Sequence, residues 1–508
     1  METQITSRPL GEVEMFFAAL SAIGTPIDRE HATLFIVLHL RFPPSIPDPE
    51  PYLARAWEIV GHRYPALGST LSGPDPSDSQ GRPTLVVPQY EGGDWLDKTF
   101  SSHPDCGSVD DLLADMGRPS TLRCCWLPKL SQLMIRTSHW RIDGIGLALL
   151  ANVLSETVAN VIRGGLSAPL PQDAFSSIPP SLESLARSKI DIHSNAGPDK
   201  LRMAIDEVVT SFAHGLPGIG LPTRQASESH LPGPSARAAV TLDKETTSRV
   251  ASASRSLGFS VTCAVHAAII RVVSSFEQKS HARKYTSFGP LNLRDNLSMK
   301  DIPGGSQPHG VLQSGLPISL DAFTTERTST PNDRRDFKSI AHELRESYAA
   351  DLESFHQLEG GGHASFLEGA QSYISRLLQM LKDAPQPDAA QITTPDLSSL
   401  GKLEKFMQHE YSVTENPEEP QLELSNYWMG IEVLTRILVF HLWSWKGELV
   451  LSVSWNRSYY EREFVTSILD SVVKEMLDEL NPPETARNVW NLVPAEKMPW
   501  GGDTCTNT

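Results

Sequence analysis

The sequence predicts an α/β protein of the α+β kind that is divided into two halves. Residues 1–165 alternate between strand-like and helix-like patterns without a clean repeat. Residues 214–236 are rich in Gly and Pro, which is typical of a connection between folded parts. The length of 508 residues suits two large domains, each able to bury a sizeable core. We therefore assign residues 1–200 to a first half, 201–236 to a linker and 237–508 to a second half.

Strands of the first half are predicted where apolar and β-branched residues run together between polar loops. These runs cover residues 32–40 (ATLFIVLHL), 84–88 and 133–137. Stretches rich in Pro, Ser and Asp predict loops over 43–51 and 73–83. A helix is expected around 181–188, after the Pro- and Ser-rich residues 164–180.

The second half opens with a strand-like run at 237–242 and a helical pattern at 244–257. Further helices are expected over 337–355 and 366–382, separated by the breaker Gly360-Gly361-Gly362. Late strands are predicted at 436–444 and 448–455. The pattern thus returns to strands at the end of the chain.

One segment carries a candidate site. Residues 133–146, LMIRTSHWRIDGIG, predict a strand, a tight polar turn and the start of a helix. His139, Asp143 and Gly144 stand in the turn with the spacing H-x-x-x-D-G, so a rigid strand can aim the imidazole. The carboxylate falls near the helix start, where the exposed N–H groups and the helix dipole favour negative charge. Gly144 is expected to let the backbone bend where a Cβ would clash.

Chance gives about 0.05 matches to three fixed positions in a chain of this length at average residue usage. A His and an Asp that only cap a strand–helix corner remain the alternative on residue types alone. The surrounding segments decide in favour of a functional motif.

The motif and its surroundings resemble the superfamily that contains chloramphenicol acetyltransferase, condensation domains of peptide synthetases, and plant and fungal acyltransferases. The similarity covers nearly the whole chain, and it is strongest to stand-alone fungal secondary-metabolite O-acyltransferases of the trichothecene 15-O-acetyltransferase type. The segments that carry it are Arg8–Glu14, Leu53–Leu71, Val261–Ala268, Pro290–Arg294 and Leu449–Met476. The resemblance implies two acetyltransferase-like halves with mixed sheets and a tunnel between them.

By this resemblance His139 is the general base that deprotonates a hydroxyl as it attacks a thioester, with no covalent acyl-enzyme. A pKa near neutrality suits histidine to that task. Asp143 is implied to turn away from the substrate and to form a structural ion pair, with Arg294 as the best candidate partner. Ser138 stands where condensation domains have a first histidine, which favours an ester-forming enzyme.

Further site residues are predicted less directly. Ser425 or Asn426 is a candidate donor to the oxyanion of the thioester attack, with a simple turn as the alternative. Trp140 either lines the acceptor pocket or packs in the core. Arg283 and Lys284, near His281, form a small basic cluster that can meet the phosphates of coenzyme A or be a solvated face. The DFGWG signature of plant enzymes is absent.

Composition limits the partners. The formal net charge of −17 opposes binding to nucleic acid and to anionic membranes. No apolar stretch long enough for a membrane span is expected, and the N-terminal residues do not predict a signal peptide. Five cysteines, an odd number, do not predict a disulfide framework. We expect a cytoplasmic monomer without bound cofactor or metal.

Three functions are open at this stage. The first is acyl transfer from acyl-CoA, with acetyl as the expected group, to a hydroxyl of a small secondary metabolite. The second is condensation with a carrier-bound acyl donor, although the chain shows no carrier or adenylation motif. The third is a cyclase or binding protein that reuses the same tunnel without acyl transfer.

Overall fold

A computed structural model describes residues 7–480 with gaps. The gaps are 75–77, 79–80, 89–93, 172–177, 191–197, 225–230, 280, 298–309, 325–332, 413–421, and 350–392 apart from 356–357, 363–364, 374, 376 and 379. The chain forms two compact units, each assembled from three segments. The first unit holds Met1–Ser188, Asn292–Gln313 and Leu403–Glu432, and the second holds Lys189–Leu291, Ser314–Lys402 and Val433–Thr508.

This division differs from the contiguous halves that the sequence predicts. Two segments of the predicted second half belong to the first unit. Residues 403–432 join it because β15 (Leu422–Ile431) pairs antiparallel with β2 (Leu34–Arg41), and residues 292–313 contact Asp143 through Arg294 and Leu312. The predicted linker also holds part of a helix, α7 (Pro198–His214). Local patterns do not reveal a strand pairing between residues that lie almost 400 positions apart along the chain, and therefore they misplace the boundary.

The first unit is built on a mixed six-stranded sheet in the order β14-β15-β2-β7-β6-β5. β5 runs parallel to β6, and the other neighbours are antiparallel. The strands not yet bounded are β14 (Glu410–Tyr411), β7 (Gln132–Thr137), β6 (Arg123–Leu127) and β5 (Phe100–Ser102). The β2 and β7 side chains are almost all buried, as the apolar runs 32–40 and 133–137 predict.

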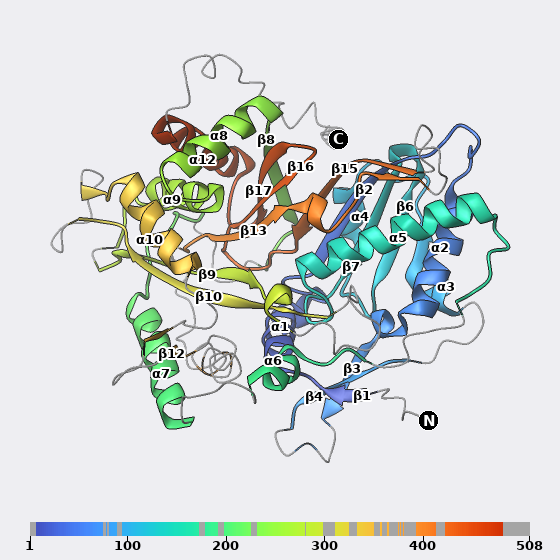
Figure 1. The fold of residues 1–508 in the computed structure, drawn as a ribbon, viewed down its shortest axis with the longest axis horizontal. Helices are drawn as coiled ribbons and strands as arrows, with labels where there is room; N and C mark the ends of the chain where they lie inside the picture. The colour runs from blue at the N-terminus through green and yellow to red at the C-terminus, as the bar shows by residue number, and fades with distance from the viewer. Residues whose placement is uncertain are drawn as a thin grey trace. The chain divides into compact units, whose positions relative to one another are not determined.

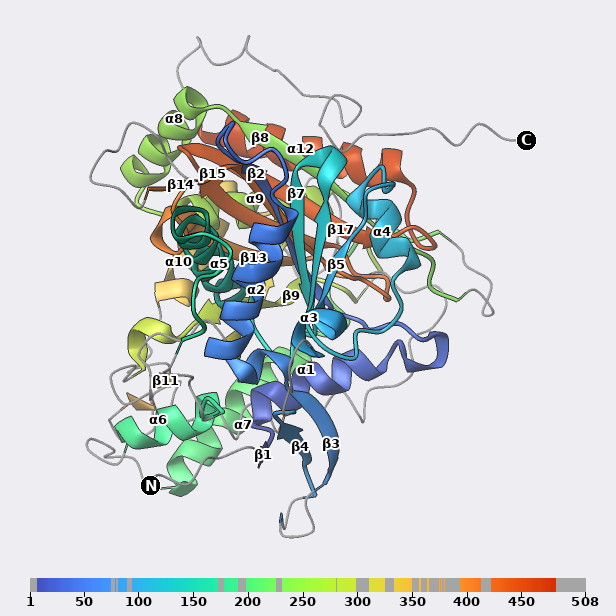
Figure 2. The same ribbon diagram turned by 90° about the vertical axis from the view of Figure 1, so that its right-hand side faces the viewer.

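Helices α2 (Glu50–Arg63) and α5 (Gly144–Gly164) pack against each other across one face of this sheet (Figure 1). A second, three-stranded sheet lies next to α1 (Glu12–Ala22) (Figure 2). Its strands, in the order β1-β4-β3, are Ser7–Pro9, Pro83–Val86 and Thr70–Pro74. The short helices of this unit are α3 (Asp94–Thr99), α4 (Val109–Asp115) and α6 (Leu182–Ile190), the last continuing into the second unit.

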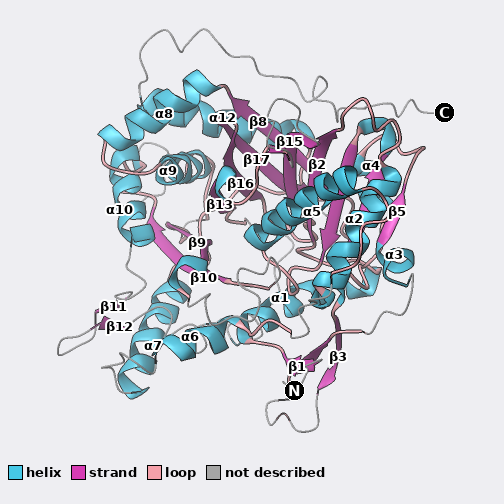
Figure 3. Cartoon of the chain, turned by 45° about the vertical axis from the view of Figure 1, so that its right-hand side comes forward, coloured by secondary structure: helices cyan, strands magenta, loops and turns pink. Residues whose placement is uncertain are grey.

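The second unit is built on a mixed four-stranded sheet, β13-β16-β17-β8, in which β13 and β16 are parallel. Its strands are Asp396–Lys402, Val439–Trp445, Glu448–Asn456 and Ser235–Leu242. Helices α8 (Lys244–Ser256), α9 (Val261–Val273) and α12 (Arg462–Leu480) pack beside it, with α10 (Phe337–Ala349) against α9 (Figure 3). Strands β9 (Lys284–Asn292) and β10 (Gln313–Asp321) form a separate ribbon, and β11 (His356–Gln357) pairs with β12 (His363–Ala364).

The predicted α/β class with mixed sheets is therefore confirmed. Predicted elements at 237–242, 244–257, 436–444 and 448–455 match β8, α8, β16 and β17 within a few residues. The helix expected over 337–355 is present as α10 up to Ala349. The Gly360–Gly362 breaker and nearly all of the helix expected over 366–382 lie outside the described residues.

One expectation about membranes needs correction. Helix α5 is long and apolar enough to cross a membrane, and α8 and α9 are so only when taken together as a pair bent by 90°. In the structure 61% of the most apolar 18-residue stretch of α5 is buried against the sheet and α2, as in the core helix of a globular unit. The cysteines in the described part, Cys106, Cys124, Cys125 and Cys263, are free thiols, and Cys505 lies outside it.

Candidate active site

The H-x-x-x-D-G segment forms the turn between β7 and α5, as its pattern predicts. β7 ends at Thr137 and α5 begins at Gly144. Asp143 is the N-cap of α5, and its Oδ1 accepts a hydrogen bond of 2.7 Å from the Gly146 N–H. This bond satisfies one of the amides that a helix start leaves without an internal partner. The cap fixes where the helix starts and hence where the turn ends.

The second oxygen of Asp143 forms the predicted ion pair. Arg294 Nη1 lies 2.9 Å from Asp143 Oδ2, and the Leu312 N–H donates to the same oxygen over 2.7 Å. The Asp143 side chain is fully buried and that of Arg294 is 8% exposed. Arg294 is expected in a strand, but it lies two residues beyond the end of β9, at the start of a 3-10 turn. The pair is thus structural, because both carboxylate oxygens are already occupied.

A chain segment that sequence reasoning did not connect to the motif closes the turn from another side. The Asp143 N–H donates to the Gly310 carbonyl over 3.3 Å, and Ile142 forms a parallel bridge with Gly310. Gly310 has a φ of +113°, a backbone conformation that residues with a Cβ rarely adopt. With Leu312, this segment holds the Asp143 backbone and side chain together.

Gly144 lies at the start of the helix that follows the turn. It is the first residue of α5, and it is not one of the glycines with positive φ in the described chain. That a Cβ at this position would clash stays a prediction. Trp140, for which pocket and core roles were both open, is 5% exposed and packs with Leu10, Leu85 and Ile178. These contacts favour the packing role.

Buried charged side chains next to the turn hold it in place through hydrogen bonds. Arg141 donates to the Ser69 carbonyl from Nε (3.1 Å) and Nη2 (2.8 Å), and its guanidinium lies 4.4 Å from the Trp140 ring centre. Ser138 donates to Glu30 Oε2 over 3.0 Å. Glu30 is 1% exposed, and burial raises the pKa of its carboxyl, although Ser138 and nearby arginines act in the opposite direction. Ser138 therefore has a structural partner of its own.

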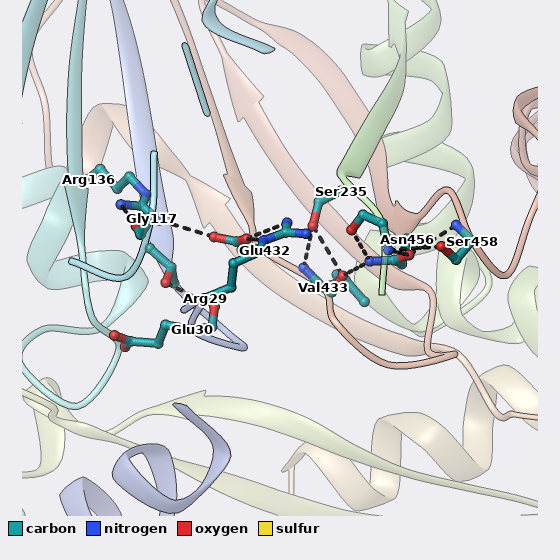
Figure 4. Close-up of polar contacts among 11 residues, drawn as sticks. Arg29, Glu30, Gly117, Arg136, Ser235, Glu432, Val433, Asn456 and Ser458 are labelled. Carbon is teal, nitrogen blue, oxygen red and sulfur yellow. Dashed lines mark hydrogen bonds and ion pairs between the residues drawn. The ribbon is translucent and has the colours of Figure 1, made fainter. Parts of the chain in front are cut away.

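A second buried carboxylate, that of Glu432, holds the strand before the turn. Glu432, directly after β15, accepts from Arg29 Nε over 2.6 Å and from Arg136 Nη2 over 3.2 Å (Figure 4). Arg136, on β7, is 1% exposed and also donates to the Gly117 carbonyl. The strand that leads to the candidate base is thus fixed by a buried ion triad. A lone Glu or Arg in the sequence gives no signal for such a network.

His139 itself lies in an apolar environment and is 7% exposed. The Phe17 ring of α1 stacks on the imidazole, with ring centres 3.6 Å apart and planes inclined by 5°. Burial lowers the pKa of His139 to about 4, while its own backbone carbonyl and the Asp143 carboxylate act in the raising direction. The imidazole is therefore neutral near pH 7, in the form that accepts a proton. Its Nδ1 is sealed from solvent.

The structure does not bring Ser425 and Asn426 to His139, which corrects the expected placement. In the sheet Asn426 faces His39 of β2, whereas Thr137, which leads to His139, faces Leu34. Five strand residues separate these positions, or about 17 Å. Ser425 donates to the His39 carbonyl at 3.1 Å and borders a separate hollow of about 560 Å³. A donor to an oxyanion must lie next to it, so neither residue fits that role.

The basic pair Arg283 and Lys284 lies in the second unit, where Lys284 begins β9. Their backbone carbonyls accept from Ala322 and Ile219, and the Arg283 guanidinium lies 5.8 Å from the Phe323 ring centre. Contact with coenzyme A stays a prediction for both. Among the described residues no group of three or more His, Cys, Asp or Glu side chains is arranged to hold a metal.

No model of a known protein family matches the chain. A relative from Epichloe uncinata, described as loline biosynthesis cluster 1 transcription factor lolU1, is 29% identical over 488 residues, which are 93% of this chain and 94% of the relative. Acetyltransferase pigO from Monascus ruber is 23% identical over 481 residues, which are 93% and 96% of the two chains. The similarity to both therefore extends over nearly the full length.

Two solved structures have the same fold. TRI3 trichothecene 15-O-acetyltransferase from Fusarium sporotrichioides superposes with a TM-score of 0.72 at 18% identity and covers 93% of this chain and 95% of its own. The first condensation domain of the calcium-dependent antibiotic synthetase superposes with a TM-score of 0.61 at 13% identity, covering 94% and 98%. At such identities the likeness establishes the fold.

Proposed function

Because the chain has the fold of the chloramphenicol acetyltransferase-like and condensation-domain superfamily, we propose that it is an O-acyltransferase. It moves an acyl group, most simply acetyl, from acyl-CoA to a hydroxyl of a small secondary metabolite. The observation that carries the proposal is the neutral, buried His139 at the end of β7, in a turn that Asp143 and Arg294 fix by a 2.9 Å ion pair. The similarity to acetyltransferase pigO adds support.

Of the two His139 ring nitrogens, Nε2 is the one placed to accept the proton of the acceptor hydroxyl. Since His139 Nδ1 is sealed from solvent, Nε2 is left to face a substrate. Nε2 takes the proton of the acceptor hydroxyl while the hydroxyl oxygen attacks the thioester carbonyl carbon. The tetrahedral intermediate collapses, the C–S bond breaks, and the thiolate leaves with the bonding electrons. The imidazolium returns the proton to the thiolate, so the products are an ester, a free thiol and neutral His139.

Asp143 takes no part in the proton transfer in this scheme. Its Oδ1 is engaged by the Gly146 N–H and its Oδ2 by Arg294 and the Leu312 N–H. Its role is to hold the turn so that the His139 ring is aimed before substrate arrives. Such preorganisation avoids ordering costs at the moment of reaction.

Two other readings are weaker. A carrier-bound donor would make this a condensation enzyme, but Ser138, which bonds Glu30, stands where condensation domains have their first histidine. The name of the loline-cluster relative implies gene regulation, which belongs to that protein. For this chain a net charge of −17 opposes the counterion release that drives binding to DNA.

The test is thiol release from acetyl-CoA in the presence and absence of a panel of hydroxylated natural products. With a productive alcohol, His139→Ala should lower turnover on the order of 10²–10⁴-fold. The matched control is His62→Ala, which removes an exposed histidine of α2 in the same unit. It should turn over like the wild-type protein.

Each alternative has its own outcome in this assay. Product from an acetylated carrier protein but not from acetyl-CoA would establish a condensation-type donor. Conversion of a metabolite without thiol release would indicate a cyclase. A correctly folded His139→Ala protein with wild-type turnover would exclude His139 as the base.

A further inference from the structure

Helix α1 is held firmly at its N-terminus, on the side of the unit that carries the motif. Arg8 of β1 contacts both oxygens of Glu14 at 2.7 and 2.6 Å, and the Gly11 N–H donates to Glu14 at 2.7 Å. Glu183 of α6 accepts from the Val13 N–H at 3.0 Å. Because these partners are largely buried, they fix the helix more strongly than exposed ion pairs would. The helix therefore presents its next turn in a defined position.

Phe17, one turn further along α1, meets the candidate base. Its ring and the His139 ring are nearly parallel, with an interplanar angle of 5° and a centre-to-centre distance of 3.6 Å. Two neutral aromatic rings prefer an offset or edge-to-face arrangement at larger separations. A cation above the ring face is favoured by the ring quadrupole. The observed stack therefore suits an imidazolium better than a neutral imidazole.

The charged neighbours of His139 within its unit are committed to other partners. Asp143 is engaged by Arg294 and two backbone N–H groups, Arg141 is directed to a backbone carbonyl, and Glu30 accepts from a serine. None of these hydrogen bonds reaches the imidazole ring. The aromatic ring that contacts the imidazole in the described part of the chain is that of Phe17.

We propose that Phe17 is a positioning residue that fixes the plane of the His139 ring and stabilises the imidazolium formed during acyl transfer. The inference rests on the proposed function, because it is acyl transfer that charges the ring. The interaction grows as the proton arrives, so it favours the transition state over the resting enzyme. The stack thus adds to the Asp143 carboxylate, whose charge also favours the protonated ring.

Phe17 has two opposing effects on the resting base. It excludes water from the ring, which lowers the pKa of His139, and its π face favours the charged form, which raises it. Burial is the larger influence, since the pKa lies at about 4. A small residue at position 17 should therefore raise the pKa toward the usual 6.5, whereas an aliphatic residue of similar size should leave it low. Comparing the two separates water exclusion from π stabilisation.

The experiment uses the full chain with Phe17→Ala, Phe17→Leu and Phe17→Tyr, each checked for folding by circular dichroism. The His139 ring proton is titrated by NMR without acyl donor, and kcat is measured with acetyl-CoA and a productive alcohol. Phe17→Ala should raise the His139 pKa by at least about one unit. Phe17→Leu should keep it low but reduce kcat about 3- to 30-fold. Phe17→Tyr should retain kcat within about twofold.

The matched control is Phe16→Ala, which removes the same volume from the same helix. The Phe16 and Phe17 rings are inclined by 79°, with centres 5.3 Å apart. It should leave the His139 pKa unchanged. An equal pKa change in Phe16→Ala, or wild-type kcat in Phe17→Leu, would overturn the inference.

Failure of the proposed function is distinguishable from failure of this inference. The NMR titration needs no acyl donor, so a pKa shift specific to Phe17→Ala supports the contact even if the wild-type protein releases no thiol. Absence of thiol release by wild type would instead refute acyl transfer from acetyl-CoA. An unshifted pKa in Phe17→Ala refutes the positioning role whether or not wild type is active.

Discussion

Replacing Asp143 by Asn tests whether the carboxylate is structural or catalytic. The change keeps the size of the side chain and can keep its cap, because Asn is as good an N-cap as Asp. Oδ1 can still accept from Gly146. The amide NH₂, however, then faces the Leu312 N–H and the Arg294 guanidinium. Both groups are hydrogen-bond donors, and in the native protein they lie 2.7 and 2.9 Å from Asp143 Oδ2, so the NH₂ group has no acceptor there. The buried Arg294 loses its counterion.

The size of the loss follows from this burial. Asp143 is 0% and Arg294 8% exposed, so solvent screens their interaction little. Breaking such a pair from one side typically costs about 3–5 kcal/mol. Arg294→Met should cost a similar amount, because it leaves the carboxylate without its cation. The double variant leaves no unpaired charge, so its cost should fall short of the sum by at least about 2 kcal/mol.

The assay is urea unfolding followed by tryptophan fluorescence, with kcat measured on the folded fraction at low temperature. Stability should fall in both single variants, and turnover should fall less than in His139→Ala. An Asp143→Asn protein that unfolds at the wild-type urea midpoint yet has no turnover would refute the structural role. Purely additive costs in the double variant would show that the two charges do not depend on each other.

Two further predictions concern stability. Glu432→Gln removes the carboxylate shared by Arg29 and the buried Arg136, and should cost about 3–5 kcal/mol in urea unfolding. Glu423→Gln, in an exposed pair near the opposite end of β15, should cost less than about 1 kcal/mol, and equal losses would contradict the burial argument. His266 is fully buried and its pKa is lowered to about 3, against 6.5 when unfolded, so this group leaves stability unchanged above pH 6.5 and lowers it as pH falls toward 3. Its share of the loss between pH 7 and pH 5 is about 2 kcal/mol, which His266→Gln should remove; an unchanged pH slope would show that His266 is not neutral in the folded state.

The sequence determined the local part of the site. Strand, turn and helix around His139 follow from the apolar run 133–137, the polar turn and the helical pattern after it. The cap by Asp143 follows from its position at the helix start, which the backbone geometry of any helix rewards. The Asp143–Arg294 pair was predicted only through the resemblance to a known superfamily. Its members lie 151 residues apart, so no local pattern links them.

What only the tertiary structure decided depends on contacts between distant segments. Phe17 is one of several apolar residues in its helix, and nothing in the pattern distinguishes a ring that stacks on a base from one that packs in a core. Ser425 was misplaced because its distance from His139 is set by the register of β15 on β2, which a one-dimensional pattern does not contain. Likewise, only the paired strands show which segments form each unit. Periodicity fixes local conformation, whereas register and side-chain packing arise when the chain closes on itself.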